Sequence, residues 1–398
     1  MKSLLLPSKP AQHVRGFCAS LSTLMLTGLL LVAGESASIA QTLSISYTFC
    51  SQTSGAFCSD GALPYAGLAR DGAGNFYGTT SVGGSKNLGT VYKLSAAGQY
   101  TLLHSFSTSD GAVPYGGVFI DSSGNLYGTA TSGGPKANGV LYKIDGAGNF
   151  KVVHVFQGSD GSQPSSVLIR DKVGNFYGTT YSGGAFGLGT IFKLTLKGKL
   201  TTLYSFDGPT GANPYAGLLL DSNGNLFGTT TAGGGPGYGT IFKLDPSGVL
   251  SVLYAFDGSD GSKPYGGVVR DPKGNLYGTT ISGGAGGVGI LYKLSLLGKL
   301  TPLYTFDGVS GANPYATLIA DSTGNLYGTT LRGGVSGLGT AFKFNTSSQS
   351  LTTIENFQLQ GAYPVAPLLL DAEGNLYGTT LGTSDLPSLG TIFKIAPQ

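Results

Sequence analysis

The hydrophobic and β-branched residues of this chain fall into short segments separated by turns. In residues 211–260, for example, they group at 216–220, 225–230, 240–244 and 250–256. Each segment is rich in Thr, Ile, Leu, Tyr or Phe and is bounded by glycine or proline, which is typical of β-strands. No stretch beyond residue 40 shows sustained helical periodicity with a capping signal. The pattern predicts an all-β protein built from short strands.

The four-segment unit recurs with a constant period of fifty residues. Its clearest marker is Asp-x-x-Gly-Asn-(Leu/Phe)-(Tyr/Phe)-Gly-Thr, which begins at Asp71, Asp121, Asp171, Asp221, Asp271, Asp321 and Asp371. The marker suits a hairpin, because its aspartate can accept backbone hydrogen bonds and its glycine can adopt a positive φ angle. Four-stranded units of this length are typical of β-propeller blades, whose repeats run from about 40 to 50 residues.

The two ends of the chain indicate how the ring closes. The last repeat stops after its third segment, 391–395, whereas a segment at 43–49 precedes the first repeat. This segment matches 200–206 at leucine, tyrosine and phenylalanine with identical spacing. Pairing the ends would complete the seventh blade and remove exposed sheet edges. We therefore predict one domain at 41–398, a seven-bladed β-propeller closed by its N-terminal strand.

The first forty residues differ from the rest of the chain. A basic opening precedes an apolar run at 21–33, and small residues follow up to Ala40. This order predicts a signal peptide over residues 1–40 that is cleaved before Gln41. A retained N-terminal anchor is the alternative. We expect an exported protein, secreted or periplasmic, with no membrane span in the mature chain.

Composition narrows the possible partners. Glycine supplies 68 of the 398 residues, but it does not recur at every third position as it does in collagen. Charged residues make up only 11%, against roughly 25% in ordinary domains, and the net charge is +3 without charged blocks. These values exclude the strongly basic surface typical of nucleic-acid-binding proteins.

Two cysteines remain after the predicted cleavage. Cys50 and Cys58 lie in a junction that is seven residues longer than its counterpart between Phe206 and Pro214. An even number of cysteines in an exported chain favours a disulfide. Two thiols without a neighbouring histidine leave zinc short of ligands. We expect a structural disulfide and neither a metal nor another cofactor.

The repeat resembles a known family. The unit Asp-x-x-Gly-Asn-Leu-Tyr-Gly-Thr-Thr…Gly-Gly…Gly-Thr-(Ile/Val)-(Phe/Tyr)-Lys-Leu is similar to the GloVer tandem repeat of exported bacterial proteins, and the resemblance covers residues 43–398. It implies a propeller-like fold and a surface or extracellular setting, but no particular activity. Some members carry a C-terminal anchoring tail. None follows the last segment here, so we expect a free product.

Catalytic and metal-binding patterns are weak. The hairpin aspartates could suggest calcium, but valine and lysine stand at Val173 and Lys273, where further ligands would be needed, so turn capping is the better interpretation. His104 and His154 occupy a strand position held elsewhere by tyrosine, which favours packing. No nucleophile elbow or phosphate loop occurs in the sequence.

An arginine asymmetry offers a possible anion site. Arg70, Arg170 and Arg270 precede the hairpin aspartate in three repeats, whereas aliphatic residues fill the other four. In a seven-bladed ring these arginines would project near one mouth of the channel and could bind an anion. The simpler alternative is that each pairs locally with an acidic side chain or with water.

The opposite face offers the strongest binding candidate. Tyrosine follows the repeated proline in five repeats, and aspartates lie a few residues earlier in four; these candidates are Tyr65, Tyr115, Tyr215, Tyr265, Tyr315, Asp60, Asp110, Asp160 and Asp260. Tyrosine rings could stack on sugars while the acids bind hydroxyls, and weak sites around a ring would gain from multivalency. The alternative is that each tyrosine packs between blades.

Together these features favour an exported, non-enzymatic binding or scaffold protein, expected to be a monomer. Its expected partner is a glycan or cell-envelope polymer, or another exported protein. The alternative is a carbohydrate-active enzyme, a hydrolase or lyase, with acidic residues in the channel. The acids that break the repeat are Glu355, Glu373 and Asp385. A purely structural role in the envelope is the third possibility.

Overall fold

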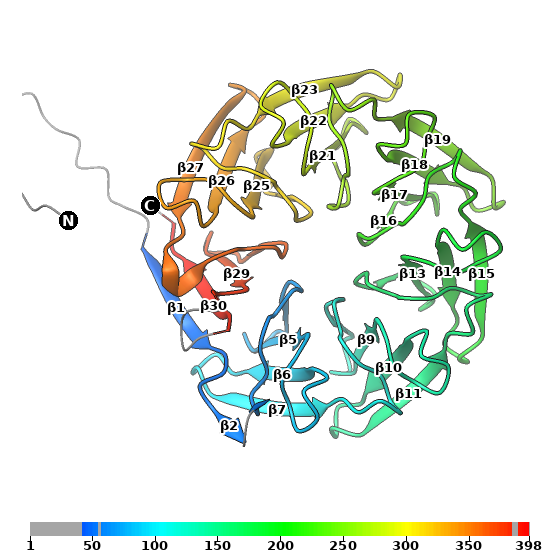
Figure 1. Ribbon diagram of the computed structural model, residues 1–398, viewed down its shortest axis with the longest axis vertical. Coiled ribbons are helices and arrows are strands. Elements are labelled where there is room, and N and C mark those ends of the chain that lie inside the picture. The colour runs from blue at the N-terminus through cyan, green and yellow to red at the C-terminus, as the bar shows by residue number, and fades with distance from the viewer. Residues whose placement is uncertain (1–41, 55–56, 384–388, 398) are drawn as a thin grey trace, which may run out of the picture. The chain divides into compact units, whose positions relative to one another are not determined.

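The computed structural model describes residues 42–54, 57–383 and 389–397. The predicted signal peptide and its cleavage position lie outside these residues, and so does Asp385. The described residues form seven four-stranded sheets, arranged as blades around a central axis (Figure 1). The predicted seven-bladed β-propeller is therefore confirmed.

Each blade runs from a short inner strand to a long outer strand. The first three blades are β4–β7 (Ala69–Arg70, Phe76–Thr80, Thr90–Leu94, Tyr100–Ser105), β8–β11 (Phe119–Ile120, Leu126–Ala130, Val140–Ile144, Phe150–Val155) and β12–β15 (Ile169–Arg170, Phe176–Thr180, Thr190–Leu194, Leu200–Ser205). The next three are β16–β19 (Leu219–Leu220, Leu226–Thr230, Thr240–Leu244, Leu250–Ala255), β20–β23 (Val269–Arg270, Leu276–Thr280, Ile290–Leu294, Leu300–Thr305) and β24–β27 (Ile319–Ala320, Asn325–Thr330, Thr340–Asn345, Ser350–Asn356). A 3-10 turn, η1 (Leu359–Gly361), follows β27.

The seventh blade joins the two ends of the chain. It contains β28 (Leu369–Leu370), β29 (Leu376–Thr380), β30 (Thr391–Ile395) and, as its outer strand, β1 (Leu43–Thr48). β1 pairs antiparallel with β30 from Leu43↔Ile395 to Thr48↔Thr391. Phe49 then donates its backbone N–H to Gly390, as Phe206 does to Gly189 in the third blade. The N-terminal strand therefore completes the ring as predicted.

The hydrophobic core lies between blades rather than within one of them. One cluster joins Ile191 and Phe206 of the third blade to Leu226 and Phe242 of the fourth, and each of the other six interfaces has a comparable cluster. Since both faces of the middle strands are covered, these strands are almost continuously buried. Each blade is thus stable only against its neighbours, which is the logic of repeat architectures.

A ring of interblade hydrogen bonds positions the channel wall. In every blade a buried threonine of the second strand donates to a carbonyl of the next blade, from Thr79 to Gly116 through to Thr379 to Ala66, which closes the circle. The accepting carbonyls belong to the segment that immediately precedes each inner strand. This segment is therefore fixed against the neighbouring blade and forms the wall of the central channel.

The inner strand is shorter than the sequence predicted. The expected strand at 216–220 is reduced to β16 (Leu219–Leu220), because the carbonyl of Ala216 accepts a hydrogen bond from Thr179 of the preceding blade. The expected outer strand at 250–256 ends at Ala255, since the N–H of Phe256 bonds to Gly239. Side-chain and loop contacts between elements override strand propensity at both places.

The long junction before the first blade forms a small hairpin. β2 (Thr53–Ser54) pairs with β3 (Phe57–Cys58), and a disulfide joins Cys50 to Cys58, whose Cα atoms are 4.5 Å apart. The disulfide expected from the cysteine count is confirmed. It fixes the loop directly after the closing strand β1.

Candidate functional site

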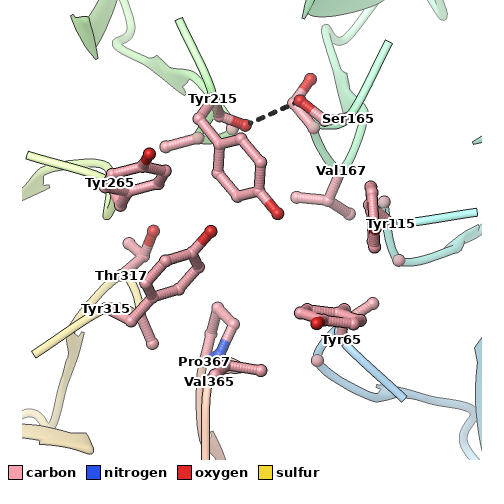
Figure 2. Close-up of a pocket in the computed structure, with 18 of the residues that line it drawn as sticks. Tyr65, Tyr115, Ser165, Val167, Tyr215, Tyr265, Tyr315, Thr317, Val365 and Pro367 are labelled. Atoms are coloured by element: carbon pink, nitrogen blue, oxygen red, sulfur yellow. Dashed lines mark hydrogen bonds between the residues drawn. The ribbon is translucent and has the colours of Figure 1, made fainter. Parts of the chain in front are cut away.

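The five tyrosines that follow the repeated proline meet at one mouth of the channel. Each stands where the loop between blades turns into the channel wall, and Figure 2 shows all five around one opening. The loop is anchored to the loop between the second and third strands, as in the bridge between Ala62 and Val82. The structure thus brings together the aromatic residues that the sequence singled out.

The tyrosines form two groups rather than an even ring. Tyr65 and Tyr115 meet edge to face, with centroids 4.8 Å apart. Tyr265 stacks on Tyr315 at 4.7 Å, and Tyr215 contacts both at 5.2 and 5.7 Å. The groups are separated where the other two blades carry Ser165 and Val365, as Figure 2 shows. The five rings thus line one composite opening.

Burial raises the pKa of four of these tyrosine hydroxyls. It raises the pKa of Tyr215 to about 12, and it also raises the pKa values of Tyr65, Tyr265 and Tyr315. The neighbouring Tyr215 contributes further to the raised pKa of Tyr315. At ordinary pH the ring therefore offers aromatic faces and neutral hydrogen-bonding groups.

Two cavities share the five tyrosines. The outer one, ≈370 Å³, is completed by Thr131, Gln163, Ser165 and Tyr181. The inner one, ≈320 Å³, continues along the axis; its wall includes Gly67, Gly117, Val167, Gly217, Thr317, Pro367, Leu68, Val118, Leu218, Val268, Leu318 and Leu368. Among the described residues that line the two cavities, none is Asp, Glu, His, Lys or Arg. The site is uncharged and becomes more apolar with depth.

The polar side of the outer cavity was not anticipated from the sequence. Ser165 replaces tyrosine in the third blade and donates to the carbonyl of Tyr215 at 3.4 Å. Beside it, Gln163 is exposed and its amide oxygen accepts a hydrogen bond from Ser182 at 3.2 Å. The signal was present in the repeat, because Ser165 and Val365 are the two departures from tyrosine at this position.

The candidate aspartates lie away from the tyrosines. Asp160 accepts from His154 at 2.8 Å, Asp110 lies 3.2 Å from His104, and Asp260 accepts from the hydroxyl of Tyr254. Each of these partners belongs to the outer strand of a blade. Asp60 likewise bonds to Tyr47 on β1. The structure does not unite the acids with the tyrosine ring.

Three arginines bridge neighbouring blades. Arg70 lies 3.5 Å from Asp371, Arg170 lies 4.0 Å from Asp121, and Arg270 lies 3.2 Å from Asp221, measured from Nη1 to Oδ2. Each arginine thus pairs with the hairpin aspartate of the preceding blade. This arrangement agrees with local pairing, which was the alternative to an anion site in the sequence analysis.

The hairpin aspartates organise their own turns. Asp71 accepts the backbone N–H groups of Ala73 and Asn75, the side-chain amide of Asn75 and the hydroxyl of Tyr77. Burial alone would raise the pKa of Asp71, but these hydrogen bonds outweigh it and lower the pKa. The backbone and side-chain bonds from the equivalent asparagine recur in the other six blades, so each carboxylate is engaged by its own loop.

The two described acids of the enzymatic alternative, Glu355 and Glu373, line neither of the two cavities. Glu355 lies on β27, in a groove with Leu43 and Leu338, where burial raises the pKa of its carboxyl group. Glu373 is exposed on a hairpin beside Arg70.

His104 stacks on Phe150 with centroids 3.7 Å apart. Burial lowers the pKa of His104 despite the nearby Asp110.

Comparison of the sequence with known families gives a clear result. The model of the Gloeobacter/Verrucomicrobia repeat matches residues 63–271 and 247–398. The chain belongs to this repeat family. The resemblance to the GloVer repeat is thereby confirmed. A search of curated proteins found no match for this family member.

Solved structures share the propeller fold of this repeat protein. The extracellular domain of a putative hybrid two-component system from B. thetaiotaomicron aligns with a TM-score of 0.60 and 15% identity, over 90% of this chain and 41% of that one. The extracellular domain of a putative one-component system from the same organism gives 0.57 and 12%, over 87% and 40%. The chain therefore spans about two fifths of the length of these two proteins.

A gluconolactonase from Xanthomonas campestris gives a TM-score of 0.50 and 11% identity, over 90% of each chain. At these identities the similarity shows the fold alone. Within the described part of this chain, the structure contains no helix of the length and apolarity that a membrane crossing needs.

Proposed function

We propose that this protein is an exported binding module that holds a glycan or a related cell-surface polymer at the tyrosine-lined mouth, without catalysing a reaction. The observation that carries the proposal is the convergence of Tyr65, Tyr115, Tyr215, Tyr265 and Tyr315 on one opening. Aromatic faces suit the apolar faces of sugar rings, and neutral hydroxyls suit their hydroxyl groups. The disulfide Cys50–Cys58 supports export, because such bonds persist in oxidising compartments.

The size and chemistry of the mouth support a small neutral epitope. A cavity of ≈370 Å³ falls within the range of about 300–1,000 Å³ that is usual for ligand pockets. Because its described lining carries no charged side chain, a charged ligand would lose hydration without gaining an ionic partner. Neutral sugars therefore suit the site better than uronic acids or phosphorylated glycans.

The test is a panel of neutral and acidic polysaccharides, in which retention by the protein and release of reducing sugars are recorded together. Retention without release supports the proposal. Release of sugars would instead support the enzymatic alternative, and would direct attention to acids outside the channel such as Glu355. The absence of both would favour a protein partner or a scaffold role.

A matched set of variants locates the binding face. Combined Tyr65→Ala, Tyr115→Ala and Tyr265→Ala changes remove three half-buried rings from the mouth, and retention should fall at least about tenfold, since stacking is worth roughly 0.5–1.5 kcal/mol per aromatic pair. Tyr238→Ala is the control, because Tyr238 is 43% exposed and lines neither cavity. Unchanged retention in the triple variant would exclude this face.

A further inference from the structure

The inner cavity differs in chemistry from the mouth above it. The mouth offers the hydroxyls of Thr131, Ser165 and Tyr181 and the amide of Gln163, whereas the deeper wall consists mostly of glycine, alanine, leucine and valine, with Ser166 and Thr317 as its additional polar residues. The same five tyrosines line both spaces, so a single occupant can reach from one into the other. Such an occupant would need a polar end and an apolar end.

The absence of charged side chains along the described lining restricts the occupant further. Burying an ionised group without a partner is costly, so a fatty carboxylate or a phospholipid headgroup would bind poorly in this channel. The raised pKa values of Tyr215 and Tyr315 keep the rim neutral as well. The polar end of the occupant should therefore be uncharged.

The channel wall leaves room for an apolar group. Glycine stands directly below the tyrosines in three of the blades, at Gly67, Gly117 and Gly217. Two other blades have Val167 and Thr317 at this position, so it accommodates a side chain. These glycines do not adopt positive φ angles, so their backbone conformation does not require glycine. A Cβ atom at Gly117 would lie 3.2 Å from the carbonyl oxygen of Gly67. Glycine thus lets the blades approach while the wall stays free of side chains.

We propose that the ligand is a neutral amphiphile, a sugar bearing an alkyl or aryl substituent, whose sugar lies among the tyrosines and whose substituent enters the inner channel. This inference rests on the proposed function and specifies its ligand class. The polar side formed by Ser165 and Gln163 gives the sugar hydroxyls a preferred direction. The apolar wall around Val167 receives the substituent.

Isothermal titration with hexyl β-glucoside, methyl β-glucoside and hexanol tests the inference directly. Hexyl β-glucoside should bind at least about tenfold more tightly than methyl β-glucoside, because burial of only about two methylene groups is worth that factor. It should also bind more tightly than hexanol and show a more negative heat-capacity change than methyl β-glucoside. These comparisons use the unmodified protein and do not depend on the folding of a variant.

A pair of variants assigns the tail to the channel. Val167→Trp fills the inner cavity and should reduce the affinity for hexyl β-glucoside to that for methyl β-glucoside. Val173→Trp is the matched control, since Val173 lies on the hairpin face of the same blade and is 78% exposed. It should leave both affinities unchanged. The melting temperature of each variant verifies that the fold is retained.

Each result bears on a different claim. Equal affinity for the hexyl and methyl glucosides, lost on removal of the tyrosines, would overturn the amphiphile inference and leave the glycan proposal standing. Equal affinity for hexanol and hexyl β-glucoside would overturn the role of the sugar in both claims. Tail-dependent binding that survives Val167→Trp would move the tail out of the channel and overturn the inference. Failure of all three ligands to bind would overturn it too, while polysaccharide retention still tests the proposed function.

Discussion

Tyr47 donates a hydrogen bond of 2.8 Å to the carboxylate of Asp60. This contact joins β1, the closing strand of the seventh blade, to the loop that enters the first blade. Ser51 donates to the same oxygen from its backbone N–H at 3.1 Å and from its hydroxyl at 2.9 Å. Tyr47 also stacks on Tyr100, whose hydroxyl donates to the backbone carbonyl of Asp60 at 2.6 Å. The closure of the ring thus depends on side chains as well as on strand pairing.

The buried carboxylate of Asp60 should contribute strongly to stability. Asp60→Ala would remove the carboxylate oxygen that accepts from both Tyr47 and Ser51, on a residue that is 1% exposed. We expect the free energy of unfolding to fall by about 1–3 kcal/mol. Asp110→Ala is the control, because Asp110 occupies the equivalent loop and is more exposed. Denaturant midpoints measure both changes, and equal losses would contradict a special role for the seam.

The disulfide should stabilise the same seam through the unfolded state. Closing the loop between Cys50 and Cys58 restricts the unfolded chain by about 2.5 kcal/mol in the chain-entropy model. The double variant Cys50→Ser, Cys58→Ser should therefore unfold at lower denaturant concentration. A thiol reductant should shift the midpoint of the unmodified protein in the same direction. The reductant should not affect the double variant, and a shift there would show that its action is unrelated to this bond.

Three blades carry a buried tyrosine hydroxyl that has no hydrogen-bond partner among the described residues, at Tyr92, Tyr142 and Tyr292. The equivalent residue is phenylalanine in the other four blades, as at Phe192. Tyr142→Phe should therefore raise the free energy of unfolding by about 1 kcal/mol, because it removes an unsatisfied polar group. Calorimetric melting measures the change. Tyr254→Phe should have the opposite effect, since the hydroxyl of Tyr254 bonds to Asp260; stabilisation by both changes would refute this explanation.

Much of the fold could be predicted because the chain repeats the same strand pattern seven times. The second and third strands are short apolar segments between glycines, and their bounds agree closely with β17 and β18. The inner strand could not be delimited in this way. Its first residues pair with a neighbouring blade, through contacts such as Thr179 to Ala216, and no property of the segment itself encodes that contact.

The site was predicted in part. The position of Tyr65 and its equivalents after a turn-forming proline placed them on one face, and the fold then gathered them. The aspartates bond instead to residues of the outer strands, and the sequence analysis did not anticipate those partners. A signal did exist: aspartate stands six residues after a tyrosine or histidine in the pairs Tyr254–Asp260 and His154–Asp160, whereas Tyr204 is followed by Thr210. A hydrogen bond within each loop explains that pairing.

The hairpin aspartates should make the propeller sensitive to acid. Burial would raise the pKa of Asp321, but hydrogen bonds from Asn325 and Thr323 lower it from 3.8 to about 2. The folded state therefore releases this proton more readily than the unfolded state. The resulting stability is present above pH 3.8 and is lost as the pH falls toward 2. In Asp321→Asn the fall of stability over this interval should be shallower, as denaturant titration at several pH values would show; an unchanged slope would contradict the assignment.

The interblade arginines should stabilise the fold only weakly, and anion binding should not depend on them. Arg270 lies 3.2 Å from Asp221 and its guanidinium lies 5.5 Å from the ring centre of Phe227. Because the pair is partly exposed, a double-mutant cycle with Arg270→Ala and Asp221→Ala should give a coupling of about 0.2–1 kcal/mol. The cycle is needed because Asp221 also caps its own turn.

Sulfate binding, followed by titration calorimetry, should not change when Arg70, Arg170 and Arg270 are all replaced by alanine. A loss of sulfate affinity in this triple variant would instead establish the anion site. Sulfate would then have to displace the aspartates from the same guanidinium groups.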